Sequence, residues 1–431
     1  MPSNPHQQKP NPHQQPPPRI YLDNAATSFP KPQAVLRAIV EYSTQNGASP
    51  GRGAYAEAVA GAAVLRRCRE RLGELVGAPA LVPPEQVIFT LNCTDALNLA
   101  IHGTVAWWKH HRPDEPIHIV STAMEHNSVL RPLTHLAAQG VRVTRVGADA
   151  DGLVAPGEVI DAIRPETRLV VMVHASNVTG TVQDVGAVGR ACRERGVPLL
   201  VDAAQTLGHL PVDVETMGID LLAFPGHKGL MGPAGTGGLY IRPGAEDRIE
   251  PVRHGGTGSR SESDQQPTDL PDRFEAGSHN TLGIAGLLAG VEWVLERTVD
   301  AIRRHEVGLI ETFLDAFPGE SAGYRLHGPT DPTRRVGVFA ITHERLAPGA
   351  LALALEARAG VLGRAGLHCA PGVHETLGTT KTGGACRLSV GPCTTTEDIR
   401  AACACLAAIS AQAGTLAGQE DRGSSTQPAS V

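Results

Sequence analysis

The chain of 431 residues is long enough for two or three domains of about 150 residues each and carries a formal net charge of −6. Because it has no basic block and an aromatic content of only 3%, its composition argues against nucleic acid as the main partner. No apolar run approaches the roughly 20 residues that span a membrane, and eight irregularly spaced cysteines indicate the reduced thiols of a cytoplasmic protein rather than a disulfide framework.

Residues 1–18 are rich in Pro, Gln and His, and they predict a disordered tail without the apolar core of a signal peptide. Short apolar runs then alternate with segments of helical periodicity. The strands are predicted at 86–91, 117–122, 141–147, 168–175, 197–204, 220–226 and 237–242, with helices at 94–108, 127–140, 156–165 and 185–196. This alternation predicts an α/β fold, in which a mostly parallel sheet is covered by helices on both faces.

The pattern of predicted helices and strands changes after residue 275. Helical segments become longer, as in 282–317, and strands become scarcer, with candidates at 334–342 and 386–391. We therefore expect a large domain over 19–275 and a smaller α+β domain over 276–411. The polar stretch 412–431 predicts a second disordered tail.

Polar side chains follow several predicted strands at their carboxyl ends, where open α/β sheets bind ligands. They are Cys93, Thr94, His126, Asn177, Asp202, Gln205, His227 and Lys228. Lys228 stands in the glycine-crowded run FPGHKGLMGPAGTGG, which is either a simple turn or a backbone that passes closely under a cofactor. A Lys that forms a Schiff base, an Asp for a ring nitrogen, a His for a ring face and a helix start for a phosphate together suit pyridoxal 5'-phosphate, PLP.

The motifs themselves carry a resemblance to a known family. They are YLDNAATSFPKP, MEHNSVLRP, HASNVTG, VDAAQTLGH, PGHKGLMGP, GGTGSRSES, FEAGSHN, GLHCAP and CRLSVG, in the family's order from residue 21 to about residue 392. The chain resembles the class V aminotransferases of PLP fold type I, and among them the SufS-like cysteine desulfurases. The resemblance implies a large domain with a mostly parallel seven-stranded sheet, a smaller C-terminal domain, and an N-terminal segment, 19–35, that packs on the smaller domain.

The resemblance also assigns residues to the cofactor. Lys228 would form the Schiff base, Asp202 would pair with the ring nitrogen, and His126 would stack on the ring and serve catalysis. Asn177 and Gln205 would bond near the phenolic oxygen. Thr94, as the opening residue of a helix, would bind the phosphate with Cys93 and His227, and Thr257 would reach the phosphate of a neighbouring subunit in a homodimer.

Two further residues are expected to contact the substrate. By the same resemblance, Arg387 would grip the carboxylate of L-cysteine together with Asn177. Cys369 would be the nucleophile that takes the substrate sulfur as a persulfide, its thiol acidified by protonated His368 or by Arg364. A sulfur-acceptor protein would then receive the sulfur, for example in iron–sulfur cluster assembly, and no metal is expected in the site.

Some features leave alternatives open. Pro225 stands where some members of the family have a phosphate-binding Ser, and Cys93 where a Thr is common. A selenocysteine lyase would share nearly every residue of the site, a PLP transaminase or β-lyase would not use Cys369, and a non-catalytic scaffold would need none of them.

Overall fold

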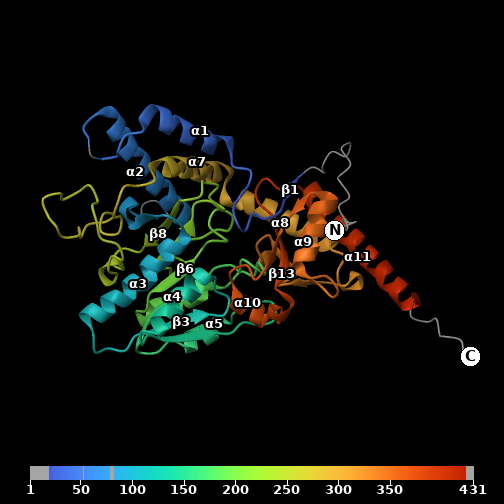
Figure 1. The fold of residues 1–431 in the computed structure, drawn as a ribbon. Coiled ribbons are helices and arrows are strands. Elements are labelled where there is room, and N and C mark those ends of the chain that lie inside the picture. Colours follow the sequence, from blue (N-terminus) through green and yellow to red (C-terminus); the bar gives the residue numbers. More distant parts are fainter. Residues whose placement is uncertain (1–18, 52, 78–81, 424–431) are drawn as a thin grey trace, which may run out of the picture.

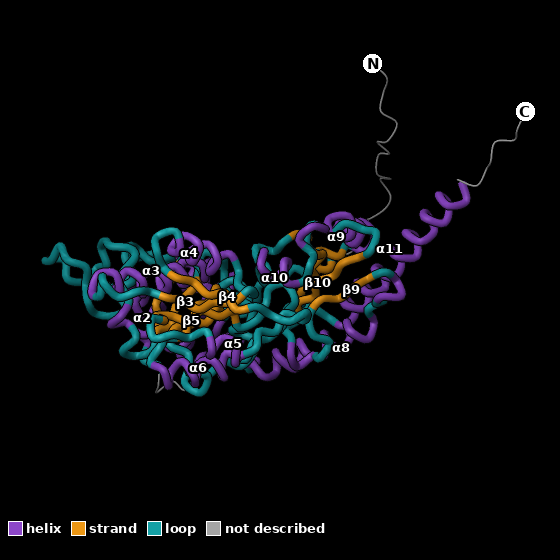
Figure 2. Tube along the Cα trace, turned by 90° about the horizontal axis from the view of Figure 1, so that it is seen from below, coloured by secondary structure: helices purple, strands orange, loops and turns teal. Residues whose placement is uncertain are grey.

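The computed structural model describes residues 19–51, 53–77 and 82–423, and side chains as far as Gln412. Figure 1 shows two parts joined side by side, and Figure 2 shows that each part has its own group of strands. None of the described helices combines the length and the hydropathy needed to cross a bilayer. The predicted tail at 1–18 lies outside the described residues.

The larger part is built on a seven-stranded sheet with the strand order β2-β8-β7-β6-β5-β3-β4. Its strands are β2 (Val87–Thr90), β3 (His118–Thr122), β4 (Arg142–Val146), β5 (Thr167–Val173), β6 (Leu199–Asp202), β7 (Leu221–Pro225) and β8 (Gly237–Ile241). The pairs from β7 through β4 are parallel, whereas β8 runs antiparallel to β2 and β7. The predicted fold class, with its mostly parallel seven-stranded sheet, is confirmed.

Both faces of this sheet are covered, which explains why its central strands β5, β6 and β7 consist mostly of apolar residues. In β6, Leu199 and Val201 belong to one buried cluster while Leu200 between them belongs to another, because successive strand residues point to opposite faces. One face is covered by α2 (Ala56–Val76), α5 (Pro156–Asp161), α6 (Val185–Arg195) and α7 (Thr281–Arg297). The other is covered by α3 (Cys93–His111) and α4 (Asn127–Ala137).

The smaller part holds a four-stranded antiparallel sheet with the order β12-β13-β10-β9. Its elements are α8 (Val299–Ala316), β9 (Tyr324–His327), β10 (Val338–His343), α9 (Pro348–Ala359), β11 (Val361–Leu362), β12 (Arg364–Gly366), α10 (Pro371–Thr376), β13 (Ala385–Ser389) and α11 (Thr396–Gly423). The prediction of few strands after residue 275 missed β9, β11 and β12, which are too short to show periodicity.

Packing shifts the boundary between the two parts. Helix α7 packs against α1 (Gln33–Glu41) and α2, and its Leu287 and Val291 lie in the core of the large sheet. The chain leaves helical geometry at Thr298, whose φ is 64°. We therefore propose that the small domain begins near Thr298 rather than at residue 276.

Both ends of the described chain meet the small domain. Strand β1 (Ile20–Tyr21) pairs in parallel with β11, and Figure 1 shows α1 leading from there along the large domain. The predicted tail at 412–431 starts too early, because α11 continues to Gly423. Its Ala, Leu, Gln and Glu residues are favourable in helices, which outweighs their polarity as a sign of disorder.

A buried ion pair ties α2 to the loop before α7. Both guanidinium N–H groups of Arg69 donate to Glu275 at 2.7 Å, and Arg69 also donates to the Val87 carbonyl. The side chains are 7% and 1% exposed, so removing one partner leaves a buried charge without compensation.

We expect Glu275→Ala to lower the free energy of unfolding by about 3–5 kcal/mol, measured from urea denaturation. Glu70→Ala is the control, because Glu70 pairs with Arg66 at the surface, where the side chains are 45% and 78% exposed, and such pairs contribute about 0–1 kcal/mol. Equal losses in the two variants would contradict a structural role for the buried pair.

Candidate active site

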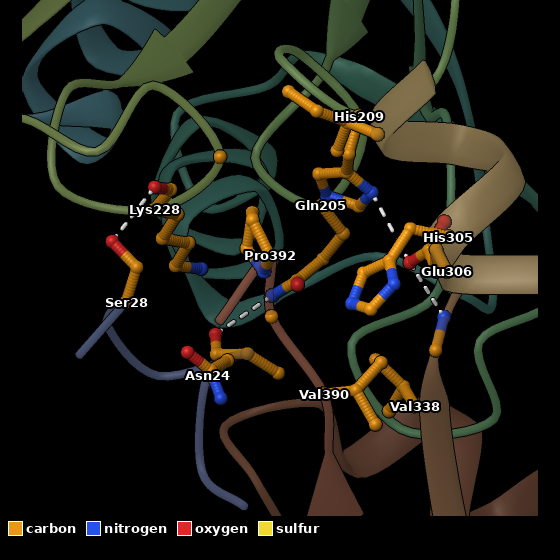
Figure 3. A pocket seen from close by; sticks show the side chains of 15 residues that line it. Asn24, Ser28, Gln205, His209, Lys228, His305, Glu306, Val338, Val390 and Pro392 are labelled. Atoms are coloured by element: carbon orange, nitrogen blue, oxygen red, sulfur yellow. Dashed lines mark hydrogen bonds and ion pairs between the residues drawn. The ribbon is translucent and has the colours of Figure 1, made fainter. Parts of the chain in front are cut away.

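The predicted site residues converge where strands of the large sheet end and the small domain begins. Asp202 is the last residue of β6, and Lys228 follows the end of β7 by three positions. A cavity reaches two of the predicted site residues, Gln205 and Lys228, and is also lined by Asn24 and Ser28 of the N-terminal segment and by Val338 of the small domain. Figure 3 shows the side chains of Lys228 and Gln205 directed into it.

A hydrogen bond holds the backbone of Lys228, and burial and the charge of Asp202 both act on its amine. The hydroxyl of Ser28 donates to the Lys228 carbonyl at 2.9 Å. Burial lowers the pKa of the Lys228 amine, while the negative charge of Asp202 opposes that shift. A buried amine of lowered pKa is more readily neutral, which is the form that attacks a carbonyl.

The glycines around Lys228 have a reason in the protein itself. A Cβ atom on Gly226 would lie 2.1 Å from the Thr236 hydroxyl oxygen, and one on Gly229 would lie 2.3 Å from the Leu207 carbonyl oxygen. Glycine is therefore required at these two positions, because the backbone is packed tightly against neighbouring loops.

Asp202 is almost wholly buried, with 2% of its surface exposed. Its Oδ1 accepts a hydrogen bond from the Ala204 N–H at 2.9 Å, and the Cys93 sulfur lies 3.5 Å from the same oxygen. Cys93 is the first residue of α3. Carboxylate, thiol and Lys228 amine thus belong to one group of buried polar atoms.

Two histidines at the site are neutral at neutral pH. His126 caps the start of α4, where its Nδ1 accepts from the Ser128 N–H at 3.1 Å. Burial lowers the pKa of His126, and it lowers the pKa of His227 to about 4. The Nδ1 atom of His227 is buried and has no hydrogen-bond partner among the described residues, so it remains available to a ligand.

The two predicted amide side chains already bond to backbone. Asn177 donates to the His368 carbonyl at 2.8 Å, and Gln205 donates to the Ala25 carbonyl at 2.9 Å. Both bonds connect the large domain to segments far away in the sequence. The two amides therefore fix the N-terminal segment and the Cys369 loop against the site.

Arg387, in β13, faces the site from the small domain and is only 2% exposed. It donates to the Asn177 carbonyl at 3.0 Å and to Asp23 at 2.7 Å, and Arg364 lies 3.1 Å from the other oxygen of Asp23. The Nε of Arg387 is buried and has no partner among the described residues. Two guanidinium groups against one carboxylate leave a net positive charge that suits an anionic group.

Cys369 lies exposed at the tip of a strained loop. His368 and Cys369 have φ values of 49° and 56°, a conformation that non-glycine residues adopt rarely and that is concentrated at functional sites. The Cys369 carbonyl accepts from the Asn127 N–H at 2.7 Å, which fixes the loop beside His126.

The predicted role of protonated His368 is wrong. Burial and the charge of Arg387 lower the pKa of His368 to about 3, so its imidazole is neutral at neutral pH. The cation that lies within electrostatic reach of Cys369 is Arg387, whose pKa a negative charge on Cys369 would raise.

Thr94 and Thr257, both predicted to bind phosphate, have the following places in the structure. Thr94 does not cap α3, because Asn92 does so, accepting from the Asp95 N–H at 3.0 Å; Thr94 lies exposed in the first turn. The Thr257 hydroxyl bonds within its own loop to the Ser259 hydroxyl at 3.1 Å. Its loop is part of the yellow region at the left of Figure 1, away from the small domain.

Sequence reasoning missed Asp23 and gave no role to Glu125. Asp23 stands in the quoted N-terminal motif, but its partner Arg387 is 364 residues away, a separation that no local pattern reveals. Glu125 is fully buried, accepts from the Thr122 hydroxyl at 2.7 Å and from the Val173 N–H at 3.0 Å, and burial raises its pKa to about 8. It is therefore protonated at neutral pH and adds no charge beside Asp202.

Known proteins resemble the chain over most of its length. The Aminotransferase class-V profile matches residues 20–401. A probable cysteine desulfurase of Methanothermobacter thermautotrophicus is 36% identical over 383 residues, covering 88% of this chain and 92% of that protein. A cysteine desulfurase of Haloferax volcanii is 32% identical over 364 residues, covering 84% of this chain and 83% of that protein.

Solved structures agree with these relatives. The apo structure of a cysteine desulfurase from Thermococcus onnurineus superimposes with a TM-score of 0.83 at 30% identity, covering 91% of this chain and 95% of the other. The cysteine desulfurase CsdA of Escherichia coli, solved with an S-sulfonic acid, gives a TM-score of 0.79 at 26% identity and covers 92% and 95%.

Proposed function

Because the chain belongs to the class-V aminotransferase family, whose members use PLP, we propose that it is a cysteine desulfurase that converts L-cysteine to L-alanine and transfers the sulfur to Cys369. This proposal rests on one arrangement of residues in the site. The exposed Cys369, on a strained loop, is held by a backbone bond from Asn127, while the buried Lys228 amine lies under the charge of Asp202 and Arg387 keeps one unsatisfied N–H.

The residues present fit PLP. Lys228 offers a buried amine of lowered pKa for a covalent bond, and Asp202 offers a carboxylate for the ring nitrogen. The unpartnered Nδ1 of His227 and the N-terminal turn of α3, with Cys93 and Thr94, suit the phosphate. Neutral His126 suits a ring face. When bound, PLP withdraws the negative charge that develops at the substrate Cα.

The substrate would be held by its carboxylate. The free Nε of Arg387 and the net positive charge of the Arg387–Asp23–Arg364 group support this role. Because Asn177 bonds both Arg387 and the Cys369 loop, it would set the distance between the carboxylate site and the thiol. Such positioning converts an encounter of two molecules into a reaction of fixed geometry.

The protein's own groups then move one proton and one sulfur atom. The Lys228 amine, whose pKa is lowered by burial, takes the proton from the substrate Cα. The Cys369 thiolate attacks the substrate sulfur and forms an S–S bond. The Cβ–S bond breaks and its electron pair stays on Cβ, which takes a proton, while protonated Lys228 returns its proton to Cα. The products are alanine and a persulfide on Cys369.

The wider setting of this reaction is also part of the proposal. The exposure of Cys369 at the surface supports delivery of its sulfur to an acceptor protein, as in iron–sulfur cluster assembly in the cytoplasm. The loop of Thr257 belongs to the large domain and lies away from the small domain in Figure 1, and this supports a homodimer in which Thr257 reaches the neighbouring site.

The test of the function is a product balance. Purified protein with PLP, L-cysteine and dithiothreitol should release alanine and sulfide in equal amounts. Sulfide accompanied by pyruvate would instead identify a β-lyase, and a half-reaction driven by pyruvate would identify a transaminase.

The role of Arg387 gives a separate prediction. Arg387→Lys keeps the charge but loses the fork that holds a carboxylate, so we expect the KM for L-cysteine to rise about 10- to 100-fold, the range of a charged hydrogen bond, with a smaller change in kcat. Arg325→Lys, an exposed position in β9, is the control. An unchanged KM in Arg387→Lys would place the carboxylate elsewhere.

A further inference from the structure

The Cys93 thiol has no role in the sulfur transfer, yet it lies at the centre of the site. It is buried, with 9% of its surface exposed, at the first position of α3. Its sulfur lies 3.5 Å from Oδ1 of Asp202. Among the described residues, Cys93 is the one whose side chain bonds to the Asp202 carboxylate, which is proposed to hold the ring nitrogen of PLP.

The thiol is the donor in this contact. Burial raises the pKa of Cys93 well above its ordinary value, and the charge of Asp202 raises it further. The sulfur therefore keeps its proton at neutral pH and can donate it only to an acceptor such as Oδ1. A thiolate at this position would instead repel the carboxylate.

Both donors act on the same oxygen of Asp202. Oδ1 accepts from the Cys93 thiol and from the Ala204 N–H, whereas Oδ2 accepts no hydrogen bond from any described residue. Oδ2 has no partner among the described residues but is not fully buried, so a ligand can reach it. The carboxylate thus keeps one oxygen occupied and one oxygen free.

We propose that Cys93 is a positioning residue, whose S–H bond to Oδ1 fixes the orientation of the Asp202 carboxylate so that Oδ2 receives the N–H of the PLP ring. This inference rests on the PLP site of the proposed function but not on its reaction. The Ala204 N–H alone leaves the carboxylate free to turn about its Cβ–Cγ bond, whereas two donors from different elements restrict it. A positioned carboxylate keeps the ring nitrogen protonated.

The first test measures cofactor binding to the apoprotein. We expect Cys93→Ala to raise the Kd for PLP about 2- to 12-fold, the factor that corresponds to one ordinary hydrogen bond. Cys93→Ser, which keeps a donor, should restore most of the affinity. Cys192→Ala is the control, because Cys192 is a buried thiol in the core of the large domain, with no hydrogen bond to a site residue.

The second test reads the ring nitrogen itself. With ¹⁵N-labelled PLP bound, the nitrogen resonance of Cys93→Ala should shift from the protonated toward the neutral pyridine value, and that of Cys93→Ser should stay near wild type. A structural loss of packing alone would not move this resonance. An unchanged Kd and resonance in Cys93→Ala would overturn the proposal.

A third measurement keeps the proposal testable if Cys93→Ala fails to fold. The infrared S–H stretching band that disappears in Cys93→Ser should lie at the lower frequency of a hydrogen-bonded thiol. A band at the frequency of a free thiol would refute the bond. None of these readouts needs turnover, so a chain that fails to release sulfide would overturn the proposed function and leave this inference standing.

Discussion

Replacing Lys228 with alanine is expected to remove both covalent retention of PLP and turnover of L-cysteine. The variant should lose PLP during gel filtration and lack the visible Schiff-base band. Because the Lys228 amine is also the proposed base at the substrate Cα, turnover should fall by at least about 10⁴-fold, the upper range for a general base alone. The measurements are the absorbance spectrum and the rate of alanine release.

Two control variants separate chemistry from charge. Lys228→Arg keeps a cation beside Asp202 but offers no amine for a Schiff base, so it should be as inactive as Lys228→Ala. Lys381→Ala removes an exposed lysine from the small domain and should behave as wild type. A visible Schiff-base band that persists in Lys228→Ala would show that another lysine carries the cofactor.

Replacing Cys369 with serine should abolish sulfide release while the PLP spectrum stays that of wild type. A hydroxyl is a poor nucleophile toward sulfur, whereas sulfur in a thiol group suits that attack. Alanine should disappear together with sulfide, because the Cβ–S bond breaks only when the thiolate takes the sulfur.

The matched control for that variant is Cys393→Ser, since Cys393 is the other exposed cysteine among the described residues. It should release alanine and sulfide at the wild-type rate. If Cys369→Ser kept sulfide release and formed pyruvate, the chain would eliminate sulfide directly and the proposed function would be wrong.

The sheet could be predicted from the sequence because its physical cause is local. A strand buried on both faces is apolar along most of its length, as the runs LVVMV in β5 and LLV in β6 show. Residues at the ends of such strands meet at one edge, which is why Asp202 and Lys228 could be placed together. The short strands β11 and β12, of two and three residues, exist only through pairing with distant segments and leave no periodic trace.

The electrostatics of the site could not be predicted in the same way. The neutrality of His368 follows from its burial and from Arg387, and that burial depends on how the two domains pack. The hydrogen bond that Arg387 donates to Asp23 joins β13 to the segment that follows β1. Motifs identify residue types for a site, whereas charge states depend on contacts that only the folded chain reveals.

The most direct test of the central claim is mass spectrometry of the protein after one exposure to L-cysteine without reductant. The account predicts that the peptide with Cys369 becomes heavier by one sulfur atom, that dithiothreitol reverses this gain, and that one alanine is released for each sulfur bound. Alanine release with the extra sulfur on another cysteine, or on none, would contradict the assignment of Cys369 as the sulfur acceptor.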